Sequence, residues 1–214
     1  MSDRPLRFTW PLMFSLQPSG LELLEHADYV YDLHHEFDAG GEAVLAQFFA
    51  DTLVGGVSGL RGFTWKTAPG NFDKAVVQEH FVYMSLQMRT VAFTPGLRLA
   101  TSIDRCSMPL GRQMLQVMDA TPARDGGCRL RWRIAVRYLP GMGVVAPLVT
   151  PLFRQMFEQT IAAVDRQLLA HRSLGERGAH PARGVPANSG SRTRRGDRRV
   201  RAPRSIDRNR DSAS

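Results

Sequence analysis

The eleven residues from Cys128 to Tyr138 constrain the fold of this chain more than any other segment. Apolar or aromatic side chains occupy every even position, and arginine occupies four of the five odd positions. Successive residues of a strand point to opposite faces, so the pattern predicts a strand with one buried and one solvated face. A Pro140-Gly141 breaker follows this strand.

A long helix is predicted after the breaker and is expected to begin near Thr150. Thr150 is a suitable N-cap residue, and Pro151 suits the first helical position because its missing N–H has no partner there. The residues expected to face inward recur at spacings of three and four: Phe153, Met156, Phe157, Thr160, Ile161, Val164 and Leu168. This face extends over about four to five turns, which is long enough to lie across a sheet.

The region before the last strand is predicted to contain one strand, two short helices and an antiparallel meander. Alternation marks a strand over 28–37, and helical spacing over 42–51 indicates a short amphipathic helix. Glycines interrupt a second, weaker helix or loop near residue 55. Strand-like runs separated by Pro and Gly turns then lie at 63–67, 74–82, 88–94, 97–105 and 112–119.

Most of the basic charge belongs to the C-terminal segment. Residues 173–214 contain eleven arginines and four acidic residues, and they account for +7 of the net charge of +8. The segment has no apolar periodicity, so we expect it to be disordered. The predicted organisation is a leader over 1–26 that packs on the body through Trp10, Leu12 and Phe14, one domain over 27–172 and a disordered tail over 173–214.

Several functional classes are disfavoured by the sequence. Cys106 and Cys128 are too few for the usual cysteine metal site, no histidine pair has helical ligand spacing, and the glycine pairs lack phosphate-loop spacing. We therefore expect two buried free thiols, no metal and no cofactor. The sequence shows no apolar run of the ~20 residues that a membrane span needs and no signal peptide, so a cytoplasmic protein is expected.

The order of these elements resembles the START-like (SRPBCC) superfamily, which contains polyketide cyclases and dehydrases, lipid-transfer domains and birch-pollen-type allergens. The resemblance spans roughly 28–172. The stretches that carry it are Phe37–Ala39 with Glu42–Val44, Val76–Glu79, Gly127–Arg133 and Pro147–Phe153. It implies an α+β helix-grip fold, in which a curved antiparallel sheet wraps around a long C-terminal helix and two short helices follow the first strand.

The chain departs from this family's pattern before and after the first short helix. Gly40-Gly41 stands where many relatives have a proline, and residues 51–56 contain no tryptophan where many relatives have one. The rim of a cavity formed by these helices is therefore expected to differ in shape. The superfamily has no universal catalytic motif, so the resemblance implies a cavity for an apolar ligand and no particular catalytic residue.

The lining of such a cavity is expected to come from the apolar strand faces and the sheet-facing side of the last helix. The candidate ligand-binding residues are Tyr31, Leu33, His35, Trp65, Met114, Met118, Trp132, Ile134, Phe153, Met156 and Phe157. The alternative is that these residues form a solid core.

Three ionisable residues are candidates for chemistry. His35 shares its face with apolar residues and could act as a general base, the alternative being a buried neutral histidine bonded to a backbone carbonyl. Glu79 and Asp104 could supply a carboxylate, the alternative being two surface positions.

The function predicted from the sequence is the binding of a hydrophobic small molecule that is polyketide-, lipid- or sterol-like. Cyclase or dehydrase activity is left open. The alternative is a non-catalytic carrier or interaction module whose basic tail contacts polyanions. The tail arginines are not interleaved with aromatic residues, so they would bind phosphates without reading bases, and no specific nucleic-acid partner is expected. The oligomeric state is not specified by the sequence.

Overall fold

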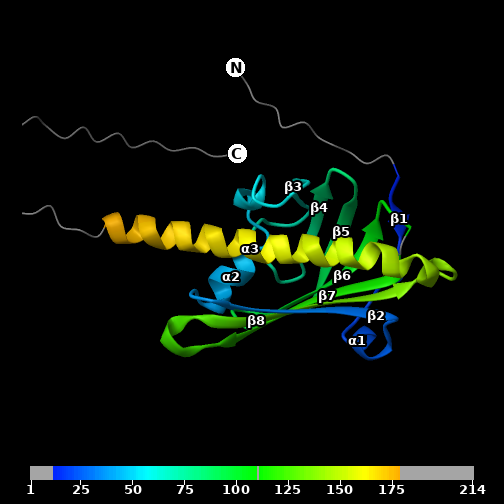
Figure 1. Ribbon diagram of the computed structural model, residues 1–214, viewed down its shortest axis with the longest axis horizontal. Helices are drawn as coiled ribbons and strands as arrows, with labels where there is room; N and C mark the ends of the chain where they lie inside the picture. Colours follow the sequence, from blue (N-terminus) through cyan, green and yellow to red (C-terminus); the bar gives the residue numbers. More distant parts are fainter. Residues whose placement is uncertain (1–11, 110, 179–214) are drawn as a thin grey trace, which may run out of the picture. The chain divides into compact units, whose positions relative to one another are not determined.

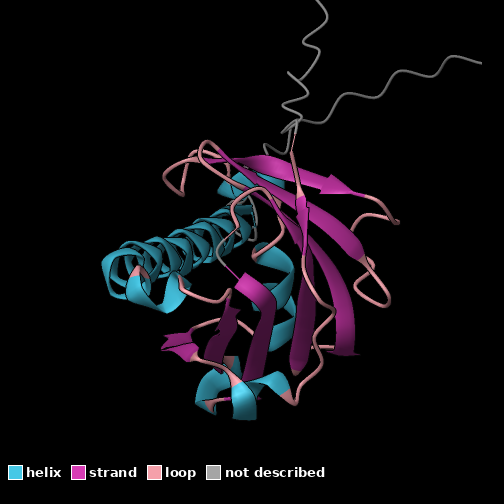
Figure 2. Ribbon diagram, turned by 90° about the vertical axis from the view of Figure 1, so that its right-hand side faces the viewer, coloured by secondary structure: helices cyan, strands magenta, loops and turns pink. Residues whose placement is uncertain are grey.

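An antiparallel sheet and the long helix α3 that crosses its inner face dominate the computed structural model, which describes residues 12–109 and 111–178 (Figures 1 and 2). The strands follow the order β2-β8-β7-β6-β5-β4-β3, and β1 pairs with β6. The predicted α+β helix-grip fold is confirmed. The elements are β1 (Phe14–Ser15), α1 (Leu23–His26), β2 (Tyr29–Phe37), α2 (Gly41–Gln47), η1 (Asp51–Leu53), β3 (Leu60–Trp65), β4 (Val76–Phe81), β5 (Ser85–Thr94), β6 (Arg98–Cys106), β7 (Gly111–Pro122), η2 (Arg124–Gly126), β8 (Cys128–Tyr138), η3 (Met142–Val144) and α3 (Ala146–Gly178).

Strand β8 occupies the predicted residues and lies between β2 and β7 in the sheet. Its apolar face is directed inward, where Trp132 is 4% exposed and lies opposite Leu33 of β2 and Met118 of β7. On the other face, Arg131 forms an ion pair with Asp32 of β2 at 2.6 Å. Arg129 pairs with Glu36 of β2 and Arg133 with Asp119 of β7, so acids on the neighbouring strands neutralise three of the four arginines of β8.

The outer face of β8 is less solvated than the alternation predicts. Ala135 is fully buried, because Leu23 of α1 packs over it together with Leu115 and Val117 of β7. The prediction of a wholly solvated face is therefore wrong at this end of the strand. The sequence pattern could not show it, because the covering helix comes from a distant part of the chain.

Helix α3 begins four residues before the predicted N-cap. It starts at Ala146, so Thr150 lies inside the helix, and its hydroxyl donates to the carbonyl oxygen of Ala146 at 2.7 Å. Pro151 is also inside the helix. Pro147 near the helix start explains the error, since an N–H in the first turn needs no partner and either proline satisfies the rule that placed the start.

The start of α2 explains the Gly40-Gly41 pair. A Cβ atom on Gly41 would overlap the carbonyl oxygen of Gly96 in the β5–β6 turn and would press on the Ala120 side chain of β7. Gly41 therefore lets the helix approach the sheet closely. The two aromatic residues that follow α2, Phe48 and Phe49, are buried.

The described part of the leader lies against the body through β1. Phe14 belongs to β1, which pairs with β6, but its side chain is 38% exposed and that of Leu12 is 63% exposed. Leu16 is buried instead. Trp10 lies outside the described residues. Helix α3 continues through Gly178, and the remainder of the predicted tail, 179–214, also lies outside them.

Candidate functional site

A cavity lies between the inner face of the sheet and the N-terminal half of α3. Its lining residues come from β2, the loop after α2, β4 to β8 and α3: Tyr31, Phe48, Phe49, Glu79, Phe81, Met84, Leu86, Ile103, Cys106, Met114, Gln116, Met118, Trp132, Ile134, Val136, Tyr138, Val149, Phe153, Met156, Phe157 and Thr160. Nearly all of these side chains are apolar or aromatic. The lining of the cavity is therefore hydrophobic.

The cavity is narrow. The empty space between its atoms is about 910 Å³ when the open mouth is included, whereas the centre of a water molecule can occupy about 60 Å³. The centre of one buried water needs roughly 10–15 Å³, so the cavity holds several waters or a slender apolar group. A larger ligand requires side chains such as those of the lining methionines to move, and methionine adapts readily to irregular shapes.

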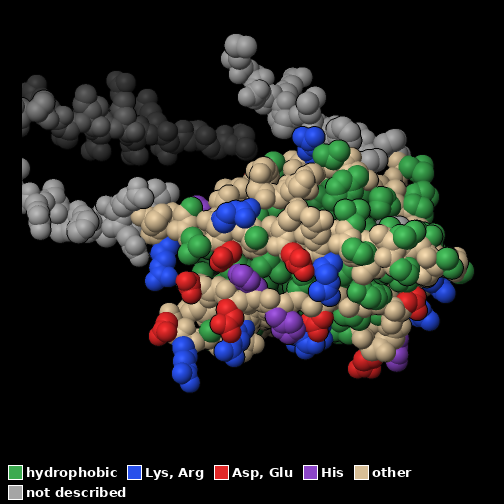
Figure 3. All heavy atoms as spheres, in the orientation of Figure 1, with side chains coloured by type: hydrophobic (Ala, Val, Ile, Leu, Met, Phe, Trp, Pro, Cys, Tyr) green, Lys and Arg blue, Asp and Glu red, His purple; other side chains and the backbone are tan. Residues whose placement is uncertain are grey.

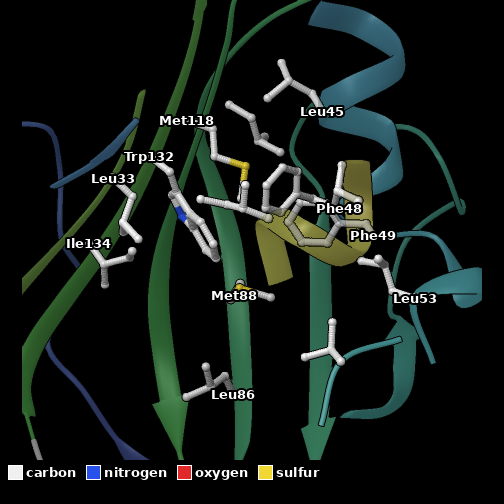
Figure 4. Packing of buried hydrophobic residues seen from close by; sticks show 14 of the residues in the cluster. Leu33, Leu45, Phe48, Phe49, Leu53, Leu86, Met88, Met118, Trp132 and Ile134 are labelled. Carbon is white, nitrogen blue, oxygen red and sulfur yellow. The ribbon is translucent and has the colours of Figure 1, made fainter. Parts of the chain in front are cut away.

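Aromatic rings form the central part of the lining. The Trp132 ring lies 5.0 Å from the Phe48 ring and 5.1 Å from the Phe157 ring, both in edge-to-face geometry. Tyr31 meets Phe157 in the same geometry at 5.2 Å. Figure 4 shows Trp132 and Met118 from the sheet directed toward Phe48 and Phe49 across the same interior space. Edge-to-face packing holds these rings in fixed orientations.

Eight of the eleven predicted ligand-binding residues line this cavity: Tyr31, Met114, Met118, Trp132, Ile134, Phe153, Met156 and Phe157. Leu33, His35 and Trp65 do not. Leu33 is buried in the core, and Trp65 packs against the rings of Phe49 and Phe72.

His35 lies near the C-terminal half of α3, away from the cavity lining. Its Nε2 atom is 3.8 Å from a carboxylate oxygen of Asp165, which is longer than a hydrogen bond. Its ring makes an edge contact with Phe37. The side chain of His35 lies on the predicted face of β2. Because β2 extends beyond the cavity, a residue on this face does not necessarily line the cavity.

Glu79, one of the two residues that the sequence offered as a carboxylate, lines the cavity. It lies on β4 between Val77 and Phe81 of the same face, and all three side chains point inward. Of the two alternatives for Glu79, a carboxylate for chemistry or a surface position, the surface position is therefore wrong. Burial raises the pKa of the Glu79 carboxyl to about 8, with no opposing cation or hydrogen bond.

A tyrosine beside Glu79 connects the sheet to α3. The hydroxyl of Tyr83, in the β4–β5 turn, donates to the sulfur of Met156 at 2.8 Å. Tyr83 is 40% exposed. Burial and then the Glu79 carboxyl raise the pKa of Tyr83. This contact joins the two layers next to the acidic side chain of the lining.

The remaining candidate groups lie on the opposite face or are inert. Asp104 faces outward, where it accepts hydrogen bonds from Arg89 at 2.7 Å and from Ser102 at 2.7 Å. Cys106 and Cys128 are buried free thiols, as predicted, and burial raises the pKa of both. Within residues 12–109 and 111–178, no group of three or more His, Cys, Asp or Glu side chains is arranged to hold a metal ion.

Solved structures share this fold at low sequence identity. The protein TTHA0849 from Thermus thermophilus matches with a TM-score of 0.53 and 12% identity, over 67% of this chain and 99% of that chain. Ara h 8.0201 matches with a TM-score of 0.51 and 11% identity, over 66% and 98%. A START superfamily protein from Mycobacterium smegmatis matches with a TM-score of 0.50 and 11% identity, over 64% and 95%.

The chain therefore has the START-like helix-grip fold. No protein-family model matches the sequence. No curated protein matches it either. Among the helices that the structure describes, none is both long and apolar enough to cross a membrane.

Proposed function

We propose that this protein binds a hydrophobic small molecule in the cavity between the sheet and the N-terminal half of α3. The observation that carries the proposal is the lining itself, in which aromatic and aliphatic side chains from six strands, the α2 loop and one helix surround a space that already admits water. An enclosed, mostly apolar pocket with a few polar groups is the usual form of a small-molecule site.

Exposed apolar side chains around the N-terminal part of α3 support this proposal. Val144, Leu148 and Leu152 are 83%, 79% and 62% exposed, and Val149 and Phe153 of the same segment line the cavity. Figure 3 shows hydrophobic side chains gathered at the end of the molecule where α3 begins. An apolar ligand approaching the cavity from this end would meet an apolar surface.

The test is a calorimetric titration with 2-naphthylmethanol, a neutral bicyclic probe. We expect a dissociation constant in the micromolar range for the unaltered protein. Met156→Trp places a larger ring in the cavity, so it should weaken binding at least tenfold and shift the melting midpoint by only about 2 °C. Leu169→Trp is the matched control, because Leu169 is exposed on the C-terminal half of the same helix and does not line the cavity.

Absence of binding to the unaltered protein would overturn the proposal. Unchanged affinity in Met156→Trp would do the same, since the probe would then bind elsewhere. A close-packed core would give a third result, in which Met156→Trp destabilises the protein by about 1–3 kcal/mol through overpacking and no probe binds.

Cyclase or dehydrase chemistry is a second candidate function, and Glu79 is the observation that favours it. A carboxyl group in an apolar cavity with a pKa near neutrality is suited to transfer protons to and from a substrate. Turnover of a polyketone substrate that Glu79→Gln abolishes, with probe affinity retained within about twofold, would support this candidate. Turnover that survives Glu79→Gln would contradict it.

A further inference from the structure

The titratable side chains of the cavity lining are all acids. Besides Glu79, the lining contains the hydroxyls of Tyr31 and Tyr138 and the thiol of Cys106, and each of these groups gains a negative charge when it titrates. Within residues 12–109 and 111–178, no Lys, Arg or His lines the cavity. A ligand with a carboxylate or phosphate therefore finds no cation to pair with.

Glu79 also lacks a cationic partner inside the protein. It takes part in none of the ion pairs formed by the described residues. Its neighbours on the adjacent strands are Phe63 of β3 and Leu86 of β5. His80 follows Glu79 in β4, and its ring contacts the hydroxyls of Thr64 and Ser85.

The helix that covers the cavity does not supply a charge to Glu79. Its lining residues Met156, Phe157 and Thr160 are uncharged, and the Thr160 hydroxyl donates to the backbone carbonyl of Met156 at 2.9 Å. Tyr83 is the titratable group that interacts with Glu79, and it too is an acid. Glu79 is half-buried, and its ionised form is costly in an apolar lining without a counter-charge, which a ligand can supply.

We propose that the cavity selects a hydrophobic ligand that carries a basic nitrogen, which Glu79 binds as an ammonium–carboxylate pair. This inference rests on the proposed function. The aromatic lining favours the same class of ligand, because the faces of rings such as those of Trp132 and Tyr31 attract cations. A charge-assisted hydrogen bond is stronger than a neutral one.

The number of protons released on binding follows from the protonation states of the free protein and the free ligand. Near pH 7 the Glu79 carboxyl of the empty cavity holds its proton, because burial raises its pKa to about 8, and an alkyl amine in water is protonated. The complex holds one ammonium and one carboxylate. The O–H bond of Glu79 therefore breaks on binding, and close to one proton per ligand is released to the buffer.

The test compares three naphthalene ligands of similar size: 2-naphthylmethylamine, 2-naphthylmethanol and 2-naphthoate. Calorimetry at pH 7 in two buffers with different ionisation enthalpies gives both the affinity and the number of protons released. We expect the amine to bind about tenfold or more tightly than the alcohol, the carboxylate to bind most weakly, and amine binding to release close to one proton.

Glu79→Gln should reduce the ratio of the amine affinity to the alcohol affinity to about one and should abolish the proton release. Glu79→Leu provides a second variant with no polar side chain and should behave in the same way. Glu158→Gln, an exposed position on α3, should leave all three affinities unchanged.

Equal affinities of the unaltered protein for the amine and the alcohol would overturn this inference and leave the proposed function intact. Retention of the amine preference in both Glu79 variants would also overturn it. Failure of all three ligands to bind would instead contradict the proposed function itself.

Discussion

Replacing Glu79 by glutamine should stabilise the protein at neutral pH, although it removes a residue of the candidate site. Burial raises the pKa of this carboxyl from 4.5 to about 8, so the folded state binds the proton more tightly than the unfolded state does. Stability is then highest below the unfolded pKa and falls as the pH rises toward 8. Glutamine does not titrate, so Glu79→Gln should lose this dependence on pH.

The magnitude of this stabilisation follows from the difference between pH 7 and the pKa of the Glu79 carboxyl in the unfolded state. That difference is about 2.5 units, and one unit corresponds to about 1.4 kcal/mol, so the unaltered protein loses about 3 kcal/mol by pH 7. Near pH 4 the loss is close to zero. For a domain of this size, about 3 kcal/mol corresponds to a rise in melting midpoint of roughly 6–12 °C.

The assay is urea unfolding of the unaltered protein, Glu79→Gln and the exposed control Glu158→Gln at pH 5, 6, 7 and 8. The difference between the unaltered protein and Glu79→Gln should grow with pH, whereas Glu158→Gln should follow the unaltered protein. A constant difference across this range, or a Glu79→Gln variant that is less stable at pH 7, would refute the reasoning. Glu79 would then have a partner or solvent access that keeps its pKa near the ordinary value.

Two further predictions concern the frame that holds the cavity. Gly41→Ala should destabilise the protein by about 1–3 kcal/mol in urea unfolding, because its Cβ would overlap the Gly96 carbonyl oxygen. Gly40→Ala should change stability by less than about 0.5 kcal/mol, since its Cβ would lie 3.8 Å from the nearest atom, and equal effects would contradict the close-approach argument. Removal of residues 179–214, which lack apolar periodicity, should leave the melting midpoint within about 2 °C, and a fall of more than about 5 °C would show that they stabilise the body.

The sequence predicted the parts of the fold that depend on local periodicity. The alternation over 128–138 identified β8 with both of its ends, because a strand between two neighbours must bury every second residue. The start of α3 was less certain for a physical reason. Pro147 and Pro151 both satisfy the rule for the first helical turn. Which of them lies near the helix start depends on where η3 positions the chain relative to the sheet.

The candidate site was predictable where a side chain's face decides its role. Trp132, Phe157 and Met118 have the inward parity and lie at the cavity. His35 has the same parity but lies farther along β2, beside Asp165, and strand parity carries no information about position along the helix.

Glu79 shows where prediction from residue type fails. Val77 and Phe81 flank it at two-residue spacing and indicate an inward face, but Val76 on the other face obscures the pattern. An acidic residue is rarely buried without a partner, so its type predicted the surface. This rule fails at positions where a site maintains a polar group at a cost to stability.

The central claim is that the cavity under α3 binds a small apolar molecule, and methyl NMR of the methionines tests it most directly. Met84, Met114, Met118 and Met156 line the cavity, whereas Met88 is buried in the core and does not line it. Titration with 2-naphthylmethanol should shift the methyl signals of the four lining methionines, because a bound ring lies against them, and should leave Met88 almost unchanged. Signals of the lining methionines that stay unchanged at saturating probe would contradict the claim.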